Sequence, residues 1–234
     1  PTEGFRISLK VHAFPAGRPL ELASLAKDDE QRQILESVSV RALTTVEGAL
    51  TSTATTHQVK LVQALQRASR GVIYDESSQH IWDPPQRFNF ALVDAVTPLQ
   101  LAHIHVEPRE KRHDQAVWVH SHGLERIGFP NIDILGLDRV WASRAKQLVE
   151  YLVGQLELAK EAERANLRSF DIEGERLRLI PKAEYVALLR GVELIGARSD
   201  ANHQDERVVL VDPKAQNTPY PLVLTRVLDQ LTRR

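Results

Sequence analysis

The sequence predicts an α+β protein in which mixed or antiparallel sheets are flanked by helices. Two observations lead to this class. Segments with the two-residue alternation of strands and segments with the 3.6-residue periodicity of helices follow one another without a regular strand–helix–strand rhythm. The chain also has 234 residues, 42% of them hydrophobic, which is enough for a substantial core in one large domain or two small ones.

The chain opens with elements of both kinds. Residues 5–12 alternate apolar and polar side chains and are expected to form a half-buried strand. Residues 20–38 are expected to form a helix with a break near Asp28, and residues 39–56, which are polar and β-branched, a strand followed by a loop.

A second helix and a hairpin come next. Residues 57–70 place apolar side chains on one helical face, and Gly71 ends that helix. Residues 72–74 and 80–82 are expected to pair as a hairpin around a polar turn, after which Pro84 stops the strand.

The middle of the chain predicts two strands, residues 99–107 and 116–121, joined by a charged loop. Residues 131–135 form a third short strand. Asp138 is expected to cap a long helix with a continuous apolar face, made by Trp141, Ala145, Leu148, Val149, Leu152, Val153 and Leu156.

The last part of the chain predicts four more elements. They are a strand over residues 174–181, a helix over 183–192, a strand over 207–213 and a helix over 221–231.

These elements suggest three segments. We expect an N-terminal α+β unit over residues 1–88, with its boundary between Pro84 and Asn89, and a second α+β unit over residues 89–180. Residues 181–234 are expected to form a helix–strand–helix extension packed on the second unit. Each half has room for a strand–helix–hairpin unit of ferredoxin-like type.

Composition excludes several partners and chemistries. A formal net charge of −1, from 30 basic and 31 acidic residues, argues against nucleic acid as a partner. No apolar run is long enough to span a membrane, and the absence of cysteine excludes disulfides, zinc–thiolate sites and a cysteine nucleophile. We therefore expect a cytoplasmic protein. Since the chain starts at Pro1 and lacks methionine, we expect a processed or trimmed chain, and the spacing arguments assume unbroken numbering.

Residues 101–136 hold five of the nine histidines, four of them as two H-x-H pairs: His103 with His105, and His120 with His122. Alternate strand residues share a face. If Ile104 and its apolar neighbours on the first strand lie on the same face of the sheet as the apolar residues of the second strand, all four histidines lie on the opposite face. A slip of one residue would reverse this alignment.

Such a cluster has two interpretations. Four imidazoles on adjacent strands can bind a divalent metal such as zinc, nickel, iron or manganese, and copper also suits imidazole. In that reading Glu107, Glu125 and Asp133 are available to orient the ligands, and one histidine or Glu125 would act as general base toward a metal-bound water. Alternatively, the histidines are structural or contact a ligand without metal, together with Trp118, Glu125 and Arg126.

Standard catalytic motifs are absent. Histidine-triad nucleotide hydrolases need three alternating histidines in one strand, whereas each strand here has two. Two-histidine phosphoesterases need H-x-[ST], and here His105 and His122 stand where the hydroxyl should be. The chain also contains no phosphate-binding loop, no dinucleotide-binding glycine motif and no G-x-S-x-G.

The stretch "VWVHSHGLERIGFPNIDILG" resembles a motif in a group of bacterial proteins of unknown function. The motif is a strand followed by T/S-x-G-L, then a turn with G-x-P and a strand of alternating acidic and apolar residues. Gly123, Gly128 and Pro130 match it, and Asn131 departs because an acidic residue is usual there. The resemblance covers roughly residues 57–180. It implies a two-unit α+β fold and an association with bacterial stress or toxin-neutralising functions.

Independently of this resemblance, the two glycines and the proline predict a defined loop between the histidine strand and the next strand. Together these features predict a non-catalytic binding or interaction module, with a protein partner or self-association. The alternative is a metal-dependent hydrolase or other metalloenzyme that uses the four histidines.

Overall fold

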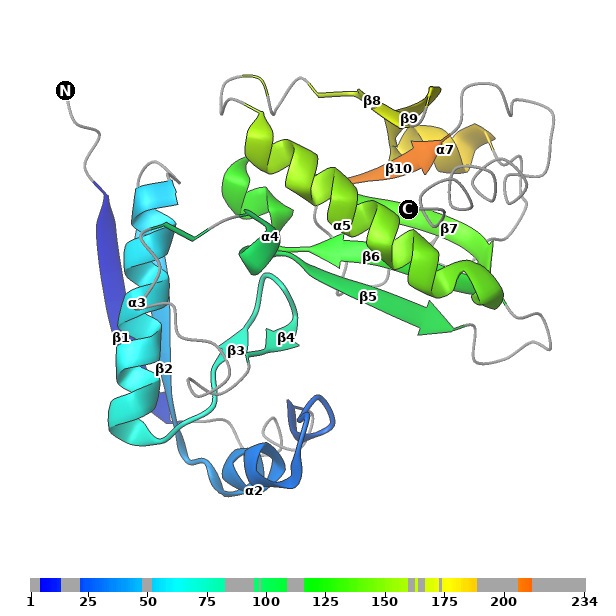
Figure 1. The fold of residues 1–234 in the computed structure, drawn as a ribbon. Coiled ribbons are helices and arrows are strands. Elements are labelled where there is room, and N and C mark those ends of the chain that lie inside the picture. Colours follow the sequence, from blue (N-terminus) through cyan, green and yellow to red (C-terminus); the bar gives the residue numbers. More distant parts are fainter. Residues whose placement is uncertain are drawn as a thin grey trace. The chain divides into compact units, whose positions relative to one another are not determined.

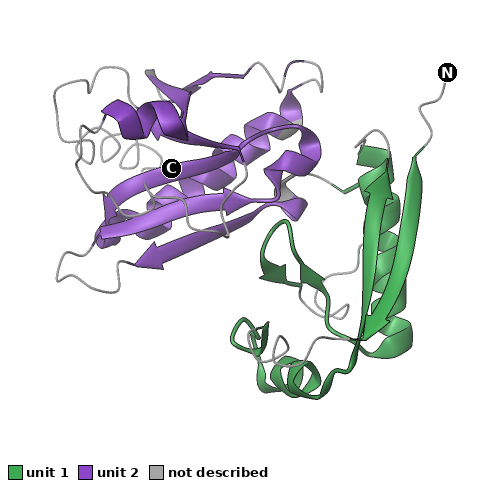
Figure 2. Cartoon of the chain, turned by 180° about the vertical axis from the view of Figure 1, so that it is seen from behind, with its two compact units in different colours: residues 1–97 green, residues 98–234 purple. Residues whose placement is uncertain are grey.

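The computed structural model describes residues 5–13, 22–47, 52–82, 95–96, 98–108, 116–159, 163, 167–172, 174–188 and 206–211. The chain divides into two compact units, residues 1–97 and 98–234, drawn in green and purple in Figure 2. Both units combine helices with strands, so the predicted α+β class is confirmed. The boundary expected between Pro84 and Asn89 lies outside the described residues. In the described part of the chain, no helix is long and apolar enough to cross a membrane.

In unit 1, β1 (Arg6–Ala13) pairs with β2 (Val40–Glu47) as a two-stranded antiparallel ladder. Helix α3 (Ser52–Ser69) runs alongside this ladder (Figure 1), and the Gln58 side chain donates a hydrogen bond to the Thr44 carbonyl oxygen at 3.1 Å. The helix begins earlier than predicted, so the loop expected over residues 52–56 was wrong. The Thr56 hydroxyl donates to the Ser52 carbonyl at 2.7 Å, which satisfies it inside the helix.

The predicted break near Asp28 is confirmed. Helix α2 (Asp29–Ser37) begins directly after Asp28, whose carboxylate accepts a hydrogen bond from the Gln31 amide at 2.8 Å. The predicted hairpin is also present, as β3 (Tyr74–Asp75) and β4 (His80–Ile81). Its buried Ile81 packs with Ala23 and Leu35 in a small core of unit 1.

The described strands of unit 2 form one six-stranded sheet in the order β5-β6-β7-β10-β9-β8. Only β7 and β10 are parallel, and every other neighbouring pair is antiparallel. The strands are β5 (His103–Pro108), β6 (Ala116–His122), β7 (Asn131–Asp138), β8 (Ser169–Ile172), β9 (Glu175–Pro181) and β10 (Arg207–Val211). A segment far along the chain therefore supplies an interior strand.

Two details of this sheet differ from expectation. The strand predicted to start at Leu99 starts at His103, because Pro98–Leu101 forms the short helix α4. Strand β8 was not predicted at all. It pairs only with β9, and its four residues are too few for a clear alternation.

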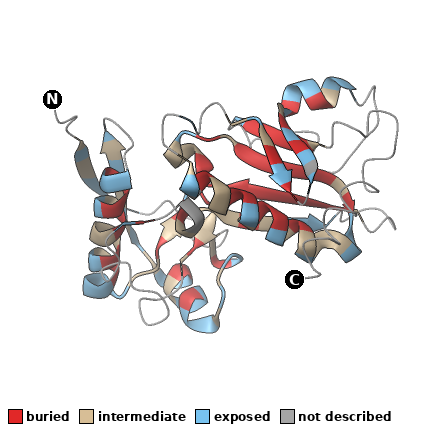
Figure 3. Ribbon diagram, turned by 45° about the horizontal axis from the view of Figure 1, so that its top comes forward, coloured by how far each residue is buried: buried red, intermediate tan, exposed pale blue. Residues whose placement is uncertain are grey.

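Helix α5 (Ala142–Leu158) covers one face of the sheet and supplies the predicted apolar stripe to the core of unit 2. The predicted cap is shifted, since Asp138 accepts from the Val140 amide at 3.0 Å at the start of the 3-10 helix η3 (Arg139–Trp141). Figure 3 shows the buried residues concentrated in the central strands and on one side of α5.

The opposite face of the sheet has its own apolar cluster. Helix α7 (Lys182–Leu188) places Tyr185 there, against Trp118, Leu135 and Val209. Strand β6 is buried at every residue from Val117 to His122, so both of its faces are covered. The helix predicted over residues 221–231 lies outside the described residues.

Candidate functional site

The strand register brings the four histidines onto one face. In the β5–β6 ladder His103 lies opposite His122, and His105 lies opposite His120. Directly opposite residues of an antiparallel pair point to the same side of a sheet. The predicted alignment is therefore confirmed. Ile104, by contrast, points into the core beneath α5. We use the name histidine face for the surface formed by His103, His105, Trp118, His120 and His122.

The four imidazole rings form a continuous cluster. The ring centre of His105 lies 4.4 Å from that of His103, 5.3 Å from that of His120 and 5.1 Å from that of His122. The rings of His120 and His122 are 4.9 Å apart. His120 and His122 are buried, whereas His103 and His105 on the sheet-edge strand are half-buried.

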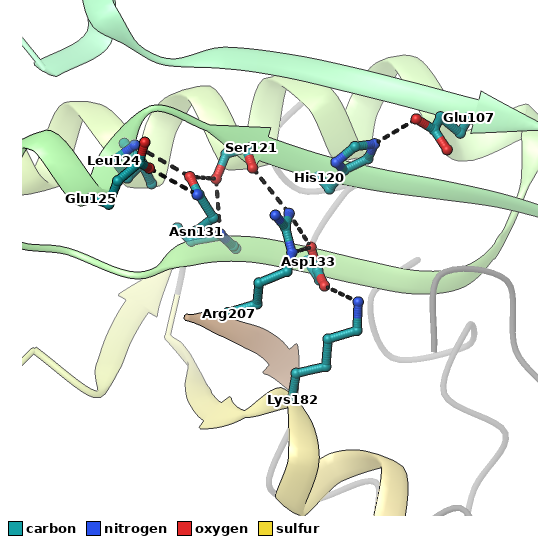
Figure 4. A network of polar contacts seen from close by, with 10 residues as sticks. Glu107, His120, Ser121, Leu124, Glu125, Asn131, Asp133, Lys182 and Arg207 are labelled. Atoms are coloured by element: carbon teal, nitrogen blue, oxygen red, sulfur yellow. Dashed lines mark hydrogen bonds and ion pairs between the residues drawn. The ribbon is translucent and has the colours of Figure 1, made fainter. Parts of the chain in front are cut away.

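His120 is held on several sides. Its ring stacks on Trp118 with the ring centres 3.8 Å apart and an angle of 14° between the planes. Its Nε2 lies 3.3 Å from Oε1 of Glu107, whose side chain is 48% exposed. The buried imidazole therefore contacts a carboxylate that is itself half-exposed; Figure 4 draws this contact.

Beside the histidines lies a buried group of three charges. Oδ1 of Asp133 accepts hydrogen bonds from Nε and Nη2 of Arg207 at 2.9 and 2.6 Å, and its Oδ2 is 3.1 Å from Nζ of Lys182. The side chains of Asp133 and Arg207 are 0% and 1% exposed, and that of Lys182 is 8% exposed. Because Asp133 lies opposite His120 in the β6–β7 ladder, this group adjoins the histidine face.

The two cations of this group also contact the tryptophan. Lys182 Nζ lies 4.8 Å from the centre of the Trp118 ring, and the guanidinium carbon of Arg207 lies 5.6 Å from it. Arg207 additionally donates a hydrogen bond to the Ser121 carbonyl at 3.0 Å. Both cations therefore lie against the face of the indole ring, whose negative charge density stabilises a positive charge.

The loop between β6 and β7 has the defined structure that the glycines predicted. Gly123 and Gly128 both adopt positive φ, at 93° and 71°, on either side of the 3-10 helix η2 (Leu124–Ile127). Oδ1 of Asn131 accepts a hydrogen bond from the Leu124 amide at 3.2 Å. The amide Nδ2 of Asn131 donates to Glu125 Oε2 at 2.9 Å, so the asparagine at this motif position ties the loop to β7.

The candidate acids occupy different places around the face. Glu107 contacts His120, and Asp133 contacts the two cations. Glu125 contacts Asn131, at the end of the network in Figure 4 that is farther from Glu107. Arg126 is half-buried in η2. The structure therefore brings Trp118 and Glu107 to the histidines, and it directs the Glu125 carboxylate to the loop.

The chemistry available at the face follows from these contacts. Within the described ranges, no three histidine, aspartate or glutamate side chains are placed so that they could hold a metal ion. The nearby Tyr185 has its pKa raised to about 12 by burial, so its hydroxyl keeps its proton at neutral pH.

Sequence reasoning missed Lys182 and Arg207. Each is the single cation at the boundary of an apolar segment, and Arg207 opens the otherwise apolar strand RVVLV. A charged residue indicates a buried ion pair when it is isolated in an apolar strand and the strand alternation places it on the buried side. Its partner Asp133 is equally isolated in the apolar β7.

Comparison with known proteins relates part of the chain to a protein family. Residues 104–184 match a family model described as "Protein of unknown function (DUF4026) C-terminal". No curated protein and no solved structure matches the chain. The matched segment begins in β5 and ends in α7, so it includes His105, His120, His122, Asp133 and Lys182. It supports the expected relation to proteins of unknown function.

Proposed function

We propose that the protein is a non-catalytic binding module and that the histidine face of unit 2 is its binding site. The observation that carries the proposal is that the two carboxylates at this face already contact neighbouring side chains. Asp133 is enclosed between Arg207 and Lys182, and Glu107 contacts His120. A buried carboxylate whose oxygens already contact two cations is poorly placed to take a proton from a substrate.

Among the described side chains of this face, those on β5 are the more exposed. His103 and His105 are half-buried, Glu107 is half-exposed, and Val106 on the other side of the strand is 37% exposed. Since β5 is the last strand at one end of the described sheet order, the side chains of His103, His105 and Glu107 lie at the rim of the histidine face. A rim of this composition suits recognition of a ligand or protein partner. A role in stress or toxin neutralisation rests on the resemblance to the bacterial group.

A metalloenzyme is the second candidate. The close spacing of the four imidazole rings favours it, because neutral imidazole is a strong ligand for divalent transition metals. In this reading Glu107, beside His120, is the group placed to orient a ligand or to accept a proton.

One experiment distinguishes the non-catalytic binding module from the metalloenzyme. The protein and its double variant His105→Ala/His122→Ala would both be assayed on phosphate and carboxylate esters. Each assay would be run with and without added zinc, nickel or manganese. We expect equal rates for both proteins under every condition. Metal-stimulated turnover that the double variant abolishes would establish the metalloenzyme and reject the non-catalytic module. Sedimentation over a range of concentrations would test self-association in the same samples.

A further inference from the structure

We propose that the outer face of helix α5 is an interface between two copies of this chain, which pack antiparallel about a twofold axis. Three large apolar side chains lie exposed along η3 and α5: Val140 is 69%, Tyr151 42% and Leu158 79% exposed. This surface lies on the side of the sheet away from the histidine face, because α5 covers the face into which Ile104 points. The interface therefore goes beyond the proposed function and does not depend on it.

Helical geometry places the three exposed side chains on one stripe. An α-helix makes one turn in about 3.6 residues, so side chains seven or eleven positions apart point in nearly the same direction. Leu158 follows Tyr151 by seven positions, Val140 precedes Tyr151 by eleven, and η3 runs directly into α5. The buried Leu152 and Leu156 lie on the opposite side of the helix, and Figure 3 shows both the buried and the exposed side. A helix that is apolar on both sides has a second surface suited to a packing partner.

The stripe is complementary to itself when two copies run antiparallel. Val140 and Leu158 lie equally far along the chain from Val149, nine positions in each direction. With the twofold axis level with Val149, Val140 of each copy faces Leu158 of the other copy, at both ends of the contact. Tyr151 faces Gln147 near the centre. In such a self-complementary contact the twofold axis repeats every pair, so one helix supplies both halves of the interface.

Charged residues beside the stripe favour the antiparallel arrangement. Lys146 and Glu150 lie about one helical turn apart on the same edge of the exposed face, and both are half-buried. Antiparallel packing level with Val149 brings Lys146 of each copy beside Glu150 of the other copy. Parallel packing would bring each lysine beside a lysine and each glutamate beside a glutamate. Opposite charges meet only in the antiparallel arrangement, and this complementarity indicates a second copy of the chain as the partner.

The size of the surface sets the expected affinity. The 18 positions from Val140 to Leu158 extend over about 27 Å of helix. A contact of one such helix from each copy lies at the small end of specific interfaces, which bury about 1,200–2,000 Å². We therefore expect a weak dimer, with a Kd of about 10–100 μM.

The first test is sedimentation equilibrium of the full chain at about 1–500 μM, a range that brackets this Kd. Leu158→Asp should raise the Kd of the dimer at least about tenfold, because it places a charge in the apolar contact. Leu188→Asp is the matched control, since Leu188 is 66% exposed on α7, and it should leave the Kd unchanged. Circular dichroism checks the fold of each variant. If Leu158→Asp loses its fold, Leu158→Ser replaces it with the same expectation.

Exchange of the two charges tests which residues face each other. Lys146→Glu and Glu150→Lys should each raise the Kd at least about threefold, because each variant by itself brings like charges together. An equal mixture of the two variants should form dimers with a Kd close to that of the wild type, since opposite charges then meet at both pairs. A mixture that associates no better than its two components would overturn the antiparallel pairing.

Cross-linking tests the same arrangement at the ends of the helix. The chain has no cysteine, so Val140→Cys and Leu158→Cys each introduce a single thiol. In the antiparallel dimer, the two copies of either position are about 27 Å apart, far beyond the reach of a disulfide. Under mild oxidation, an equal mixture of the two variants should therefore form disulfide dimers at least about tenfold faster than either variant alone.

Each outcome decides the question. A monomer at every concentration up to about 500 μM overturns the interface, as does a dimer that Leu158→Asp leaves unchanged or an assembly larger than a dimer. Cross-linking that is as fast in either single variant as in the mixture overturns the antiparallel arrangement. A dimer weakened by Leu158→Asp and cross-linked in the mixture supports the proposal. None of these measurements involves the histidines, so failure of this interface and failure of the proposed function are distinguishable.

Discussion

Asp133 is the residue on which the buried charges of unit 2 depend. It is fully buried and contacts both Arg207 and Lys182, so its removal would take away the carboxylate that the two cations share. Breaking a buried ion pair by removing one partner is far more destabilising than losing an exposed pair, because the remaining charge is desolvated without compensation.

Asp133→Asn is therefore expected to lower the free energy of unfolding by about 3–5 kcal/mol. Asp29→Asn is the matched control, because Asp29 also pairs with an arginine, at 3.3 Å, but its side chain is 90% exposed. The control should change stability by less than about 1 kcal/mol. Urea denaturation followed by circular dichroism measures both, and equal effects would contradict the assigned role of the buried network.

Tyr185 predicts a dependence of stability on alkaline pH. Burial raises its pKa from 10.0 to about 12, so the folded protein holds this proton more tightly than the unfolded chain does. The stability from this group is fully present below pH 10 and is lost as pH rises toward 12. Between these pH values, the free energy of unfolding of Tyr185→Phe should fall by roughly 2 to 3 kcal/mol less than that of the wild type.

The measurement for Tyr185 is urea unfolding at several pH values between 9 and 12, read as the slope of stability against pH. Tyr151→Phe is the control, because Tyr151 is 42% exposed on α5. Its slope should equal that of the wild type. A Tyr185→Phe variant with an unchanged slope would show that this hydroxyl titrates normally.

Substitution of glycine by alanine is expected to have opposite effects on stability in two elements: the loop that joins β6 to β7, and helix α5. Gly128 ends the 3-10 helix η2 at a φ of 71°, where an L side chain is strained although no atom lies within 4 Å of the added Cβ. Gly154 lies inside α5 with equally open space around it.

Gly128→Ala should therefore destabilise the protein by about 1–2 kcal/mol, the cost of placing alanine in the left-handed region. Gly154→Ala should stabilise it by about 0.5–1 kcal/mol, since alanine loses less conformational entropy in a helix. Thermal unfolding of both variants checks the signs. If Gly128→Ala were neutral, the backbone of the loop would not need the conformation described.

Sequence periodicity predicted most elements because their patterns are long. The stripe on α5 and the alternation in β1 and β6 extend over several turns or pleats, so local sequence is sufficient. Prediction from periodicity failed where the elements are short or where their boundaries depend on side-chain hydrogen bonds. Helix α3 extends to Ser52 with the Thr56 hydroxyl bonded inside it, and β8 has only four residues.

Each of the two units of the chain has a buried core of its own. Unit 1 packs Ala23, Leu35 and Ile81, and unit 2 buries the apolar face of α5 against its sheet. A unit with a separate core is expected to fold by itself.

Residues 98–234, expressed alone, should unfold cooperatively. The substitution Leu152→Ala should lower the free energy of unfolding of this fragment and of the full chain by the same amount. Leu152 is fully buried in the unit 2 core, so the expected loss is about 2–5 kcal/mol in both. Urea denaturation of the four proteins tests this. A fragment without a cooperative transition would show that unit 2 depends on residues 1–97.

The sequence by itself determined the α+β class, the pairing of two H-x-H strands and the loop closed by Gly123 and Gly128. These follow from local periodicity and backbone conformation. Only the tertiary structure decided that β10 enters the sheet beside β7 and that Arg207 therefore meets Asp133, 74 positions away in the chain. Contacts of such separation depend on the strand order, which local sequence does not encode.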